Sequence, residues 1–573
     1  MEHKSENRIC QNCKSSFIIE PDDFAFYGKI GVPAPTFCPQ CRMLRRMVCR
    51  NESRLFRKKD ALNGTEVFSG FPESSNVNIY DNSYWYSDDW DPLDYDFSRS
   101  FFEQFKELFE RVPLPARSSM NMVDSPYCNE ASNCRNSYLC FDSDYIENSA
   151  YLIKSTNIKD SFDSYEVIDN ELCYENVMVY KSYRTFFSLD CENCVDVWFS
   201  KGLRGCTECF GCVNLKGKSN YFFNEPLSKD EYKKKVAEFK SSSHKALQAM
   251  RQRSFDFWGQ FPVKYYHGLR NLNCTGERIF DSKNVHNSLS VQGGENIKHC
   301  QVIILNSANC YDSTINFMQI DNSYECCTCG DGSFNLKFCF NCWSSSKNLE
   351  YCCYAIGASD CFGCVGTMKK QYCILNKQYT KEDYFETVEK IKKQMMEKPY
   401  IDKQGNVYKY GEFFPAEFSP LAYNQSMAQI YFPLSAEVAN KSGFVWEEDD
   451  LNKFKVSIQS QDLPDDLQET SKALLKENIG CGVCGRAFKI IDIEEKFLKQ
   501  NNLPVPRTCH FCRFDERLKL ILNNTELYSR SCMCDNQSHT NHSSKCSEEF
   551  QTPYSPERPE IINCESCYQQ EVM

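Results

Sequence analysis

Residues 133–180 read, in four successive units, NCRNSYLCFDSD, YIENSAYLIKST, NIKDSFDSYEVID and NELCYENVMVY. Units of this region run 10–13 residues: Asn, Asp, Glu or Lys opens a unit, and Ser, Cys or an aliphatic residue then alternates with Tyr, Phe or Trp. The pattern predicts strands of four or five residues joined by tight turns. Strands this short and evenly spaced favour a β-solenoid, in which like residues stack coil upon coil; a β-sandwich is the alternative.

A second set of units begins at residue 284 with NVHNSLSVQGG and ENIKHCQVIILNS. An offset of 152 places the CFGCV of residues 209–213 on the CFGCV of residues 361–365, so the region is duplicated. A capping box follows each half, at Ser228-Lys-Asp-Glu231 and Thr380-Lys-Glu-Asp383. These boxes predict helices over about 228–252 and 380–397, which would cap the last coil of each half.

Cysteine is unusually abundant, with 36 in 573 residues, and 22 of them lie between Cys128 and Cys373. Cysteine is small and readily buried, so we interpret these 22 as a ladder inside the coils. The alternative is further metal at pairs such as Cys361 and Cys364. In a strand, however, residues i and i+3 point to opposite faces, so such a pair would chelate only at a turn. Disulfides are the least favoured interpretation, because the chain reads as intracellular.

Two matched cysteine motifs bracket the chain. Each is a C-x2-C pair followed, after 24 residues, by a second C-x2-C pair, with the ligands Cys10, Cys13, Cys38 and Cys41 in the first motif and Cys481, Cys484, Cys509 and Cys512 in the second. Four thiolates complete a tetrahedral zinc site and leave no position for water, so both sites are predicted to be structural. Both motifs resemble the probable zinc-ribbon domain family, whose pattern includes P-x-x-C-x2-C-R. The resemblance covers about forty residues twice and implies a zinc ribbon at each end.

A third cysteine cluster follows the second ribbon. Cys546, Cys564 and Cys567 are its natural ligands, and Cys534 is predicted as the fourth, with Cys532 or a histidine as substitutes. His539 and His542 are interpreted as exposed loop residues. The expected cofactor is therefore zinc, at about three ions per chain.

The segment after the first ribbon echoes this third module without its cysteines. Leu55-Phe56-Arg57 is similar to Leu527-Tyr528-Ser529-Arg530, and the phrase from Phe68 to Glu73 is similar to that from Phe550 to Glu557. We infer a metal-free N-terminal counterpart of the third module. Cys49 stands alone and is interpreted as a buried thiol.

Aromatic segments connect these parts. Phe101–Phe109 has the apolar spacing of an amphipathic helix, predicted to pack on the solenoid, and the aromatic segment from Gly411 to Pro433 is predicted to be ordered. The fold class is mainly β with short helices, a duplicated β-solenoid flanked by four-cysteine zinc ribbons. Its predicted units are a ribbon with a basic extension (1–60), an acidic aromatic segment (61–120), two solenoid halves (121–260 and 261–398), an aromatic connector (399–480), a second ribbon (481–530) and a third cysteine module (531–573).

Charge is unevenly distributed. The formal net charge is −12, which disfavours phosphate binding by the whole surface. Residues 42–59 nevertheless carry eight basic residues against one acidic residue, and these form a candidate phosphate footprint beside the first zinc site: Arg42, Arg45, Arg46, Arg50, Arg54, Arg57, Lys58 and Lys59. The alternative is that they form salt bridges with the acidic 61–120 segment.

No motif of a known catalytic centre is present, so we expect a protein that is not an enzyme. The whole pattern resembles a group of large cysteine-rich, multi-zinc-ribbon proteins of candidate-phyla bacteria. That resemblance implies no activity, and this chain departs from it in having no cysteine near Lys59. No apolar run is long enough for a membrane helix and no signal-type stretch is seen, so we expect a cytoplasmic protein without membrane association.

The leading hypothesis for function is a zinc-binding scaffold that binds nucleic acid, RNA or a ribonucleoprotein above all, through the ribbons and the basic stretch. The alternative is a protein-interaction or assembly module that uses the solenoid face, with purely structural zinc. Zinc storage ranks third.

Overall fold

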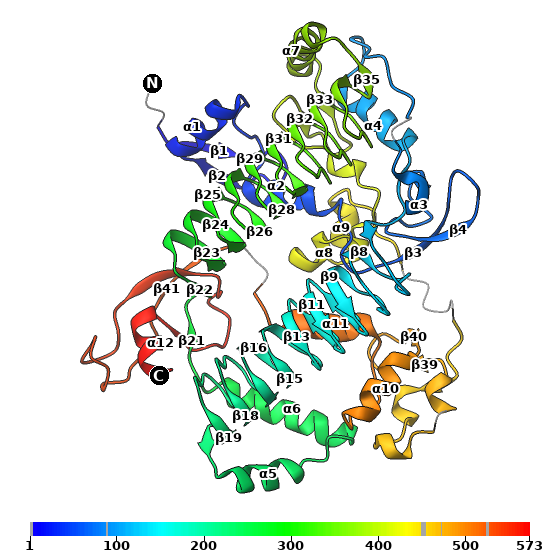
Figure 1. The fold of residues 1–573 in the computed structure, drawn as a ribbon. Coiled ribbons are helices and arrows are strands. Elements are labelled where there is room, and N and C mark those ends of the chain that lie inside the picture. Colours follow the sequence, from blue (N-terminus) through cyan, green and yellow to red (C-terminus); the bar gives the residue numbers. More distant parts are fainter. Residues whose placement is uncertain (1–3, 88–89, 449–453, 472, 523–525, 573) are drawn as a thin grey trace.

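Two β-solenoids form the body of the protein, as the computed structural model describes it over residues 4–87, 90–448, 454–471, 473–522 and 526–572. Figure 1 shows them as two ladders of short strands, one from cyan to green and the other from green to yellow-green. Successive coils pair in parallel, and each solenoid forms its own 14-stranded sheet system. The solenoid prediction is therefore confirmed and the β-sandwich alternative is wrong.

Strands β7 to β20 build the first solenoid: Ser119–Met120, Asn129–Ser132, Phe141–Glu147, Ala150–Ile153, Thr156–Lys159, Phe162–Tyr165, Ile168–Glu171, Val177–Tyr180, Tyr183–Phe186, Leu189–Glu192, Val195–Trp198, Thr207–Phe210, Ser219–Phe222 and Glu225–Pro226. Strands β22 to β35 build the second: Gly268–Leu269, Leu272–Phe280, Lys283–Gln292, Glu295–Lys298, Gln301–Ile304, Ala308–Tyr311, Thr314–Phe317, Asp321–Tyr324, Cys327–Gly330, Phe334–Lys337, Lys347–Glu350, Ser359–Phe362, Gln371–Ile374 and Lys377–Gln378.

A coil of the first solenoid contains twelve residues, as the pairing of Thr156 with Ile168 shows. Within it the backbone turns a corner at every third residue, where φ is positive: 57° at Asn157, 48° at Asp160, 52° at Asp163 and 55° at Glu166. Asn and Asp tolerate this left-handed conformation better than other residues with a Cβ, which explains why they recur along the units.

The residue after each corner points inward, so the interior repeats with a period of three. Ile158, Ser161, Ser164 and Val167 fill one coil in this way, and all are buried. The assumption that i and i+3 lie on opposite faces, taken from regular strands, is therefore wrong for this chain. Coils of the second solenoid follow the same three-residue pattern. Some of them contain thirteen residues, because one corner then has two consecutive left-handed residues, as at Asp331 and Gly332.

Small polar side chains inside the coils satisfy the backbone. The Ser161 hydroxyl donates to the Lys159 carbonyl (2.8 Å) and accepts from the Cys173 amide of the next coil (3.0 Å). The Cys191 thiol lies 3.5 Å from the Leu189 carbonyl oxygen, in the same arrangement. Cysteine thus serves as a small apolar residue with a weak donor.

The inward cysteine ladder is confirmed for most of the central cysteines. Cys327 and Cys353 are exceptions, because they follow the inward residues Cys326 and Cys352 and are buried outside the coils. Its clearest column runs through consecutive coils of the second solenoid at Cys326, Cys339, Cys352 and Cys364, all fully buried. Among the described residues, no central cysteine belongs to a group of three or more ligand atoms within 4.8 Å of one another. We therefore assign no metal to these positions.

The described helices are α1 to α12: Pro21–Ile30, Pro39–Met47, Asn82–Trp85, Phe101–Arg111, Lys229–Ala237, His244–Trp258, Lys381–Glu397, Ala428–Tyr431, Ala436–Lys441, Asp492–Gln500, His510–Leu518 and Glu565–Glu571. The strands outside the solenoids are β1 (Glu6–Ile9), β2 (Ser16–Ile19), β3 (Phe56–Lys59), β4 (Glu66–Ser69), β5 (Ile79–Tyr80), β6 (Leu114–Pro115), β21 (Val263–Lys264), β36 (Tyr400–Ile401), β37 (Val407–Tyr408), β38 (Ile458–Gln459), β39 (Ile479–Gly480), β40 (Ala487–Phe488), β41 (Tyr528–Ser531), β42 (Glu549–Thr552) and β43 (Ile562–Asn563). No helix of the described segments combines the length and the apolar character that a bilayer span requires.

Both capping boxes start helices at the last coil of their solenoid. Glu231 and Ser228 bond reciprocally at the start of α5, and Thr380 accepts from the Asp383 amide at the start of α7. Helix α7 forms as predicted. The single helix predicted over 228–252 is instead two helices, α5 and α6, because Ser243 caps a new helix after the serine-rich break.

The connecting segments are ordered against the second solenoid. Helix α4 buries Phe101 against Tyr351 and Phe362, with ring centroids 5.1 and 5.2 Å apart. Its predicted packing role is confirmed. Phe413 and Tyr423 of the later aromatic segment are buried as well, so that segment is ordered as predicted.

The two ribbons pack on the solenoids in a crossed manner. Helix α2 of the N-terminal ribbon lies against β28 of the second solenoid, and α11 of the C-terminal ribbon lies against β12 of the first (Figure 1). Met43 and Met47 share a buried apolar cluster with Ile315 of the second solenoid, whereas Phe514 packs on Tyr165 of the first. Each ribbon therefore packs on the solenoid that is more distant from it in sequence.

The three-residue corner rule can be tested at two neighbouring exposed positions of one coil. Asn157→Val places a β-branched side chain at a left-handed corner and should destabilise the protein by about 1–2 kcal/mol. The control Thr156→Val lies on the adjacent strand position, where a branched side chain fits, and should be nearly neutral. Chemical unfolding measures both. Equal effects of the two substitutions would show that the corner is not constrained.

Candidate metal centres

The N-terminal ribbon brings its four predicted ligands together. Cys10 and Cys13 lie on a turn after β1 that closes with a left-handed Lys14, where the Cys10 amide donates to the Ser15 carbonyl (2.9 Å). Cys38 is the N-cap of α2, and Cys41 lies in its first turn. The four sulfurs lie within 4.8 Å of one another, and the Cys13 and Cys38 sulfurs are 3.6 Å apart. Tetrahedral zinc thiolate sites require about 3.8 Å.

The C-terminal ribbon repeats this geometry. The Cys481 amide donates to the Arg486 carbonyl (2.9 Å), and Gly485 is the left-handed residue. Cys509 and Cys512 begin α11 as Cys38 and Cys41 begin α2. The Cys481 sulfur lies 3.7 Å from that of Cys512, and the Cys484 sulfur 3.7 Å from that of Cys509. The eight ribbon cysteines predicted as ligands thus form two candidate metal groups.

Electrostatics favour the thiolate of one cysteine in each ribbon. A hydrogen bond from Cys509 lowers the pKa of Cys481 to about 4, and hydrogen bonds from Cys38 and Cys41 lower the pKa of Cys10 as well. The same hydrogen bonds, together with burial, raise the pKa of their partners Cys38, Cys41, Cys509 and Cys512. The second knuckle of each ribbon also lies at a helix N-terminus, where the helix dipole stabilises negative charge. Four such ligands around one ion close its coordination shell, so these groups can hold metal but offer no site for a substrate.

The third group differs from the prediction in one ligand. Cys532, rather than Cys534, joins Cys546, Cys564 and Cys567, so the sequence-based choice of Cys534 is wrong and the stated substitute is right. The reason is local: the Cys564 amide donates to the Cys532 sulfur (3.2 Å), because the chain leaving β41 is held beside β43 by the Met533–Ile562 backbone bond.

Cys534 lies instead in a fourth group, with His539, His542 and Cys567. The interpretation of His539 as an exposed loop residue is wrong, since it is buried, and His542 is half-buried. Sequence reasoning missed this group because its ligands lie on a loop whose path no periodic pattern defines.

The metal-free counterpart of the third module is present at residues 56–85. Strands β3 and β4 form an antiparallel pair, as β41 and β42 do. The Ala61 amide donates to the Ile79 carbonyl (2.9 Å), and the Met533 amide donates to the Ile562 carbonyl in the same way (2.9 Å). Asp60 stands at the place of Cys532, and Tyr84 at the place of Cys567. The Tyr84 hydroxyl donates to the Asp60 carboxylate. This hydrogen bond joins the two positions that Cys567 and Cys532 occupy in the C-terminal module.

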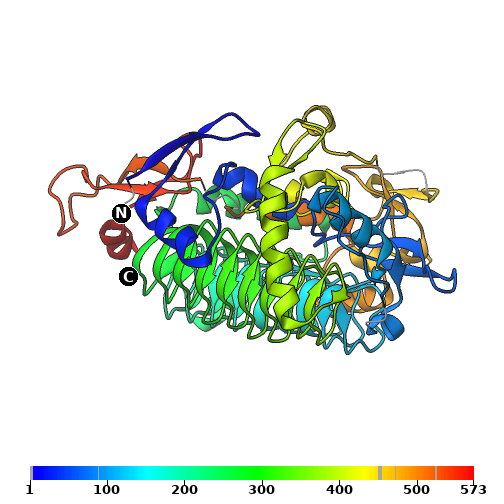
Figure 2. The ribbon, with the colours of Figure 1, turned by 90° about the horizontal axis from the view of Figure 1, so that it is seen from above.

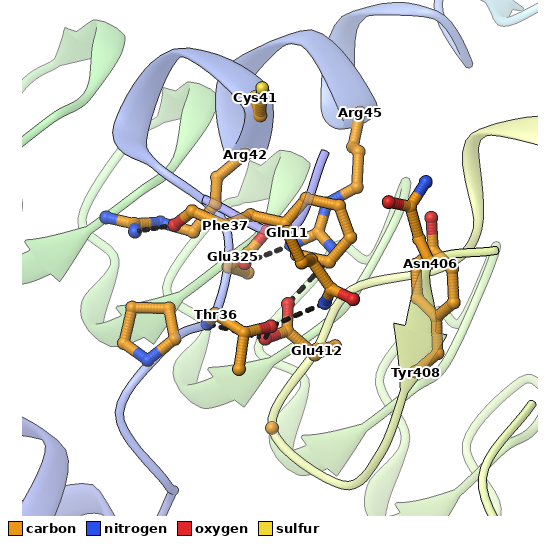
Figure 3. Close-up of polar contacts among 12 residues, drawn as sticks. Gln11, Thr36, Phe37, Cys41, Arg42, Arg45, Glu325, Asn406, Tyr408 and Glu412 are labelled. Atoms are coloured by element: carbon orange, nitrogen blue, oxygen red, sulfur yellow. Dashed lines mark hydrogen bonds and ion pairs between the residues drawn. The ribbon is translucent and has the colours of Figure 1, made fainter. Parts of the chain in front are cut away.

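The basic stretch beside the first ribbon is mostly internal. Arg42 pairs with Asp312 of the second solenoid (2.9 Å) and donates to the Phe37 carbonyl (2.6 Å). Arg45 pairs with Glu325 (2.8 Å) and Glu412 (3.0 Å), as Figure 3 shows. These arginine side chains are 2–3% exposed. They hold α2 on the acidic corners of the second solenoid.

Arg46 and Arg50 extend these contacts. Arg46, fully buried, donates to the Thr314 hydroxyl (3.1 Å) and pairs with Glu325. Arg50 bridges both solenoids, because it pairs with Asp142 of the first (3.0 Å) and donates to Thr328 of the second (2.9 Å). Through Arg50, the segment that follows the N-terminal ribbon therefore links the first solenoid to the second.

The C-terminal ribbon makes the equivalent contact on the first solenoid. Arg513 pairs with Asp163 (2.8 Å) and Glu494 (2.9 Å), and Arg517 pairs with Asp163 (3.3 Å). Arg513 and Arg517 correspond in sequence to Arg42 and Arg46. Asp163, Asp312 and Glu325 are all left-handed corner residues. Each ribbon therefore uses two arginines to engage such corners, although the C-terminal ribbon uses one corner and the N-terminal ribbon uses two, because Arg46 pairs with Glu325. Burial raises the pKa of Asp163 to about 6 even beside these arginines, which indicates strong desolvation.

The structure contradicts an exposed phosphate footprint for most of residues 42–59. Arg42, Arg45, Arg46 and Arg50 are buried in ion pairs, and Lys58 donates to backbone carbonyls of Pro72 and Ser75. The alternative prediction, salt bridges to the acidic 61–120 segment, is wrong for the buried arginines, because their carboxylate partners come mainly from the solenoids and from Glu412. It is correct for Arg57, which pairs with Glu66. Arg54 is half-buried against the Phe511 ring, and Arg57 and Lys59 are exposed.

Comparison with known proteins gives little further information. No family model matches the chain, and no curated protein matches it. Among solved structures, the chain is similar to a protein from Desulfovibrio desulfuricans G20 described as a putative acetyltransferase, with 13% identity over 52% of this chain and 87% of that one. The TM-score is 0.10, so this likeness supports no inference about fold or function.

The ribbon arginines that pair with solenoid carboxylates are called clamp arginines here: Arg42, Arg45, Arg46, Arg513 and Arg517. Removing one of them should strongly destabilise the packing of its ribbon on the solenoid. Arg42→Ala leaves Asp312 buried without its close partner, which should cost about 3–5 kcal/mol. The control Arg57→Ala removes an exposed pair and should change stability by less than about 1 kcal/mol. Hydrogen exchange of α2 in both variants measures this difference. Similar protection of α2 in the two variants would contradict a clamping role.

Proposed function

We propose that this protein is a non-enzymatic, zinc-dependent scaffold whose exposed solenoid face binds a protein partner. Zinc occupies the two ribbons and the four-cysteine group of the C-terminal module, one ion at each of these three sites. The observation that carries the proposal is the burial of the ribbon arginines in ion pairs with the solenoids. Because these arginines are engaged inside the molecule, the ribbons serve to hold the solenoids in place. The broad surface that remains for a partner is the exposed wall of the solenoid.

The coordination chemistry supports a structural role for zinc. Each proposed site has four thiolate ligands from the chain, and a site of this kind contributes folding free energy without an open position for chemistry. The ribbon helices begin at these sites, so metal binding fixes the helices that carry the clamp arginines.

The exposed wall of the first solenoid has the composition of a protein-binding surface. Tyr145, Ile168, Tyr183 and Val195 are 37–60% exposed on it. Tyr183 and Val195 are register partners on neighbouring coils. Charges of both signs lie among them, including the Arg184–Asp196 pair (2.6 Å). Exposed aromatic residues amid mixed charges suit a protein partner, whereas a phosphate backbone requires a concentration of positive charge.

The proposal can be tested with a photo-crosslinking amino acid at Tyr183 in the zinc-replete full chain, in extract of the native cells. The matched control carries the same amino acid at Ile18, which is also exposed but lies on the N-terminal ribbon. We expect one protein species to crosslink at position 183 and not at position 18. Val195→Glu should reduce the yield at least tenfold with unchanged zinc content.

Nucleic-acid binding is the outcome that would overturn this assignment. RNA or DNA crosslinked at position 183, or tight binding of either to the purified protein with a steep salt dependence, would favour the nucleic-acid hypothesis instead. Crosslinks of equal yield at positions 183 and 18 would exclude the solenoid wall as the specific surface.

A further inference from the structure

We propose that the C-terminal module holds two zinc ions that share the thiolate of Cys567. The first ion is the proposed zinc of Cys532, Cys546 and Cys564 together with Cys567, and the inference rests on that site. The second would be bound by Cys534, His539, His542 and Cys567, whose ligand atoms all lie within 4.8 Å of one another. Two cysteines and two histidines are a common ligand set for structural zinc.

The hydrogen bonds of His542 leave one ring nitrogen free for a metal. Its Nδ1 lies 2.5 Å from the carbonyl oxygen of Ser544, which can only accept, so Nδ1 carries the proton. Nε2 therefore presents its lone pair. That nitrogen is buried and has no hydrogen-bond partner among the described residues. A buried polar atom in this state needs an explanation, and a cation between His542 and its three neighbours supplies one.

His539 is oriented in the complementary way. Its Nδ1 lies 3.3 Å from the Cys534 sulfur, inside the proposed ligand group. Its Nε2 lies 3.2 Å from the Glu571 carboxylate, outside the group. A zinc-bound histidine commonly donates its second N–H to a carboxylate, which fixes the ring and increases its basicity. Glu571 is in the position to accept that bond.

Charge favours the second ion. One Zn²⁺ among the four thiolates of the first site leaves a net charge of −2, which attracts a further cation. With the second ion, five thiolates and two neutral histidines surround two Zn²⁺, and the net charge falls to −1. The shared Cys567 lies in the first turn of α12 and accepts from the Asn541 side chain (3.2 Å). Both contacts stabilise a thiolate that two ions use.

The two related modules differ in the length of the loop that would bind the second ion, which is short in the module at residues 56–85 and long in the C-terminal module. In the module at residues 56–85 the chain returns from Asp60 to Thr65 through a short turn, closed by the Asp60–Thr65 backbone bond (2.8 Å). The equivalent bond in the C-terminal module joins Cys532 to Glu548 (2.8 Å). All ligands of the second ion except the shared cysteine come from this longer loop, so the loop gains a fixed conformation from the ion it binds.

The test is the zinc content of the full-length protein by native mass spectrometry. We expect four ions per chain in the wild type, three in His539→Ala/His542→Ala, and four in the control His244→Ala/His286→Ala, whose histidines lie outside every metal group of the described chain. Three ions in both the wild type and the His539/His542 variant would overturn the second site but leave the three-zinc scaffold intact. Fewer than three in the wild type would overturn both proposals. Four ions in the His539/His542 variant would place the fourth ion elsewhere and also overturn the inference.

A second measurement on the wild type avoids dependence on variant folding. Cobalt(II) replaces zinc at such sites, and a bridging thiolate couples the spins of two neighbouring ions. The fully loaded cobalt protein should therefore show a smaller electron paramagnetic resonance signal than the same number of isolated ions. Full signal intensity at saturation would exclude the shared Cys567.

Discussion

A left-handed corner at every third residue is the constraint on which both solenoids depend. Apart from an eleven-residue spacing at the start of the second solenoid, it makes a coil twelve or thirteen residues long, and it points every third side chain into a narrow interior that holds aliphatic residues as well as Cys and Ser. Cys and Ser meet both needs of such an interior, since they are small and bond to the backbone carbonyls of their own and neighbouring coils. The abundance of cysteine in the middle of the chain fits this geometry.

The same corners provide the attachment points of the ribbons. Asp163 and Asp312 are both left-handed residues, and each pairs with arginine from the ribbon at the opposite end of the sequence. Figure 2 shows the N-terminal ribbon and the C-terminal module on one side of the solenoid coils, and α7 running across the coils. Such buried pairs cost desolvation energy, so they fix the arrangement of the parts more than they add stability. The crossed arrangement makes the duplicated chain one interlocked unit.

Much of this architecture could be predicted from residues alone. The spacing of Cys10 to Cys41 and of Cys481 to Cys512 defines the ribbons, because a thiolate site has few possible spacings. The capping boxes at Ser228 and Thr380 locate the start of the terminal helices because they act locally. The short, even units indicated a solenoid, although the assumed alternation of strand side chains hid the period of three.

The remaining features depend on contacts between distant residues. Nothing in the sequence near Arg42 shows that Asp312 lies beside it, so a basic stretch that is internal has the same pattern as an exposed one. Likewise, Cys532 and Cys534 are both plausible ligands in sequence, and only the bond between the Cys564 amide and the Cys532 sulfur distinguishes them.

The central claim is that metal in the ribbons holds α2 and α11 on the two solenoids. Hydrogen exchange of the zinc-replete and the zinc-stripped protein, followed peptide by peptide, tests it most directly. We predict that zinc removal exposes α2, α11 and the strands they cover, β28 and β12, while coils distant from both ribbons keep their protection. Unchanged protection of β28 and β12 after complete zinc removal would contradict the claim.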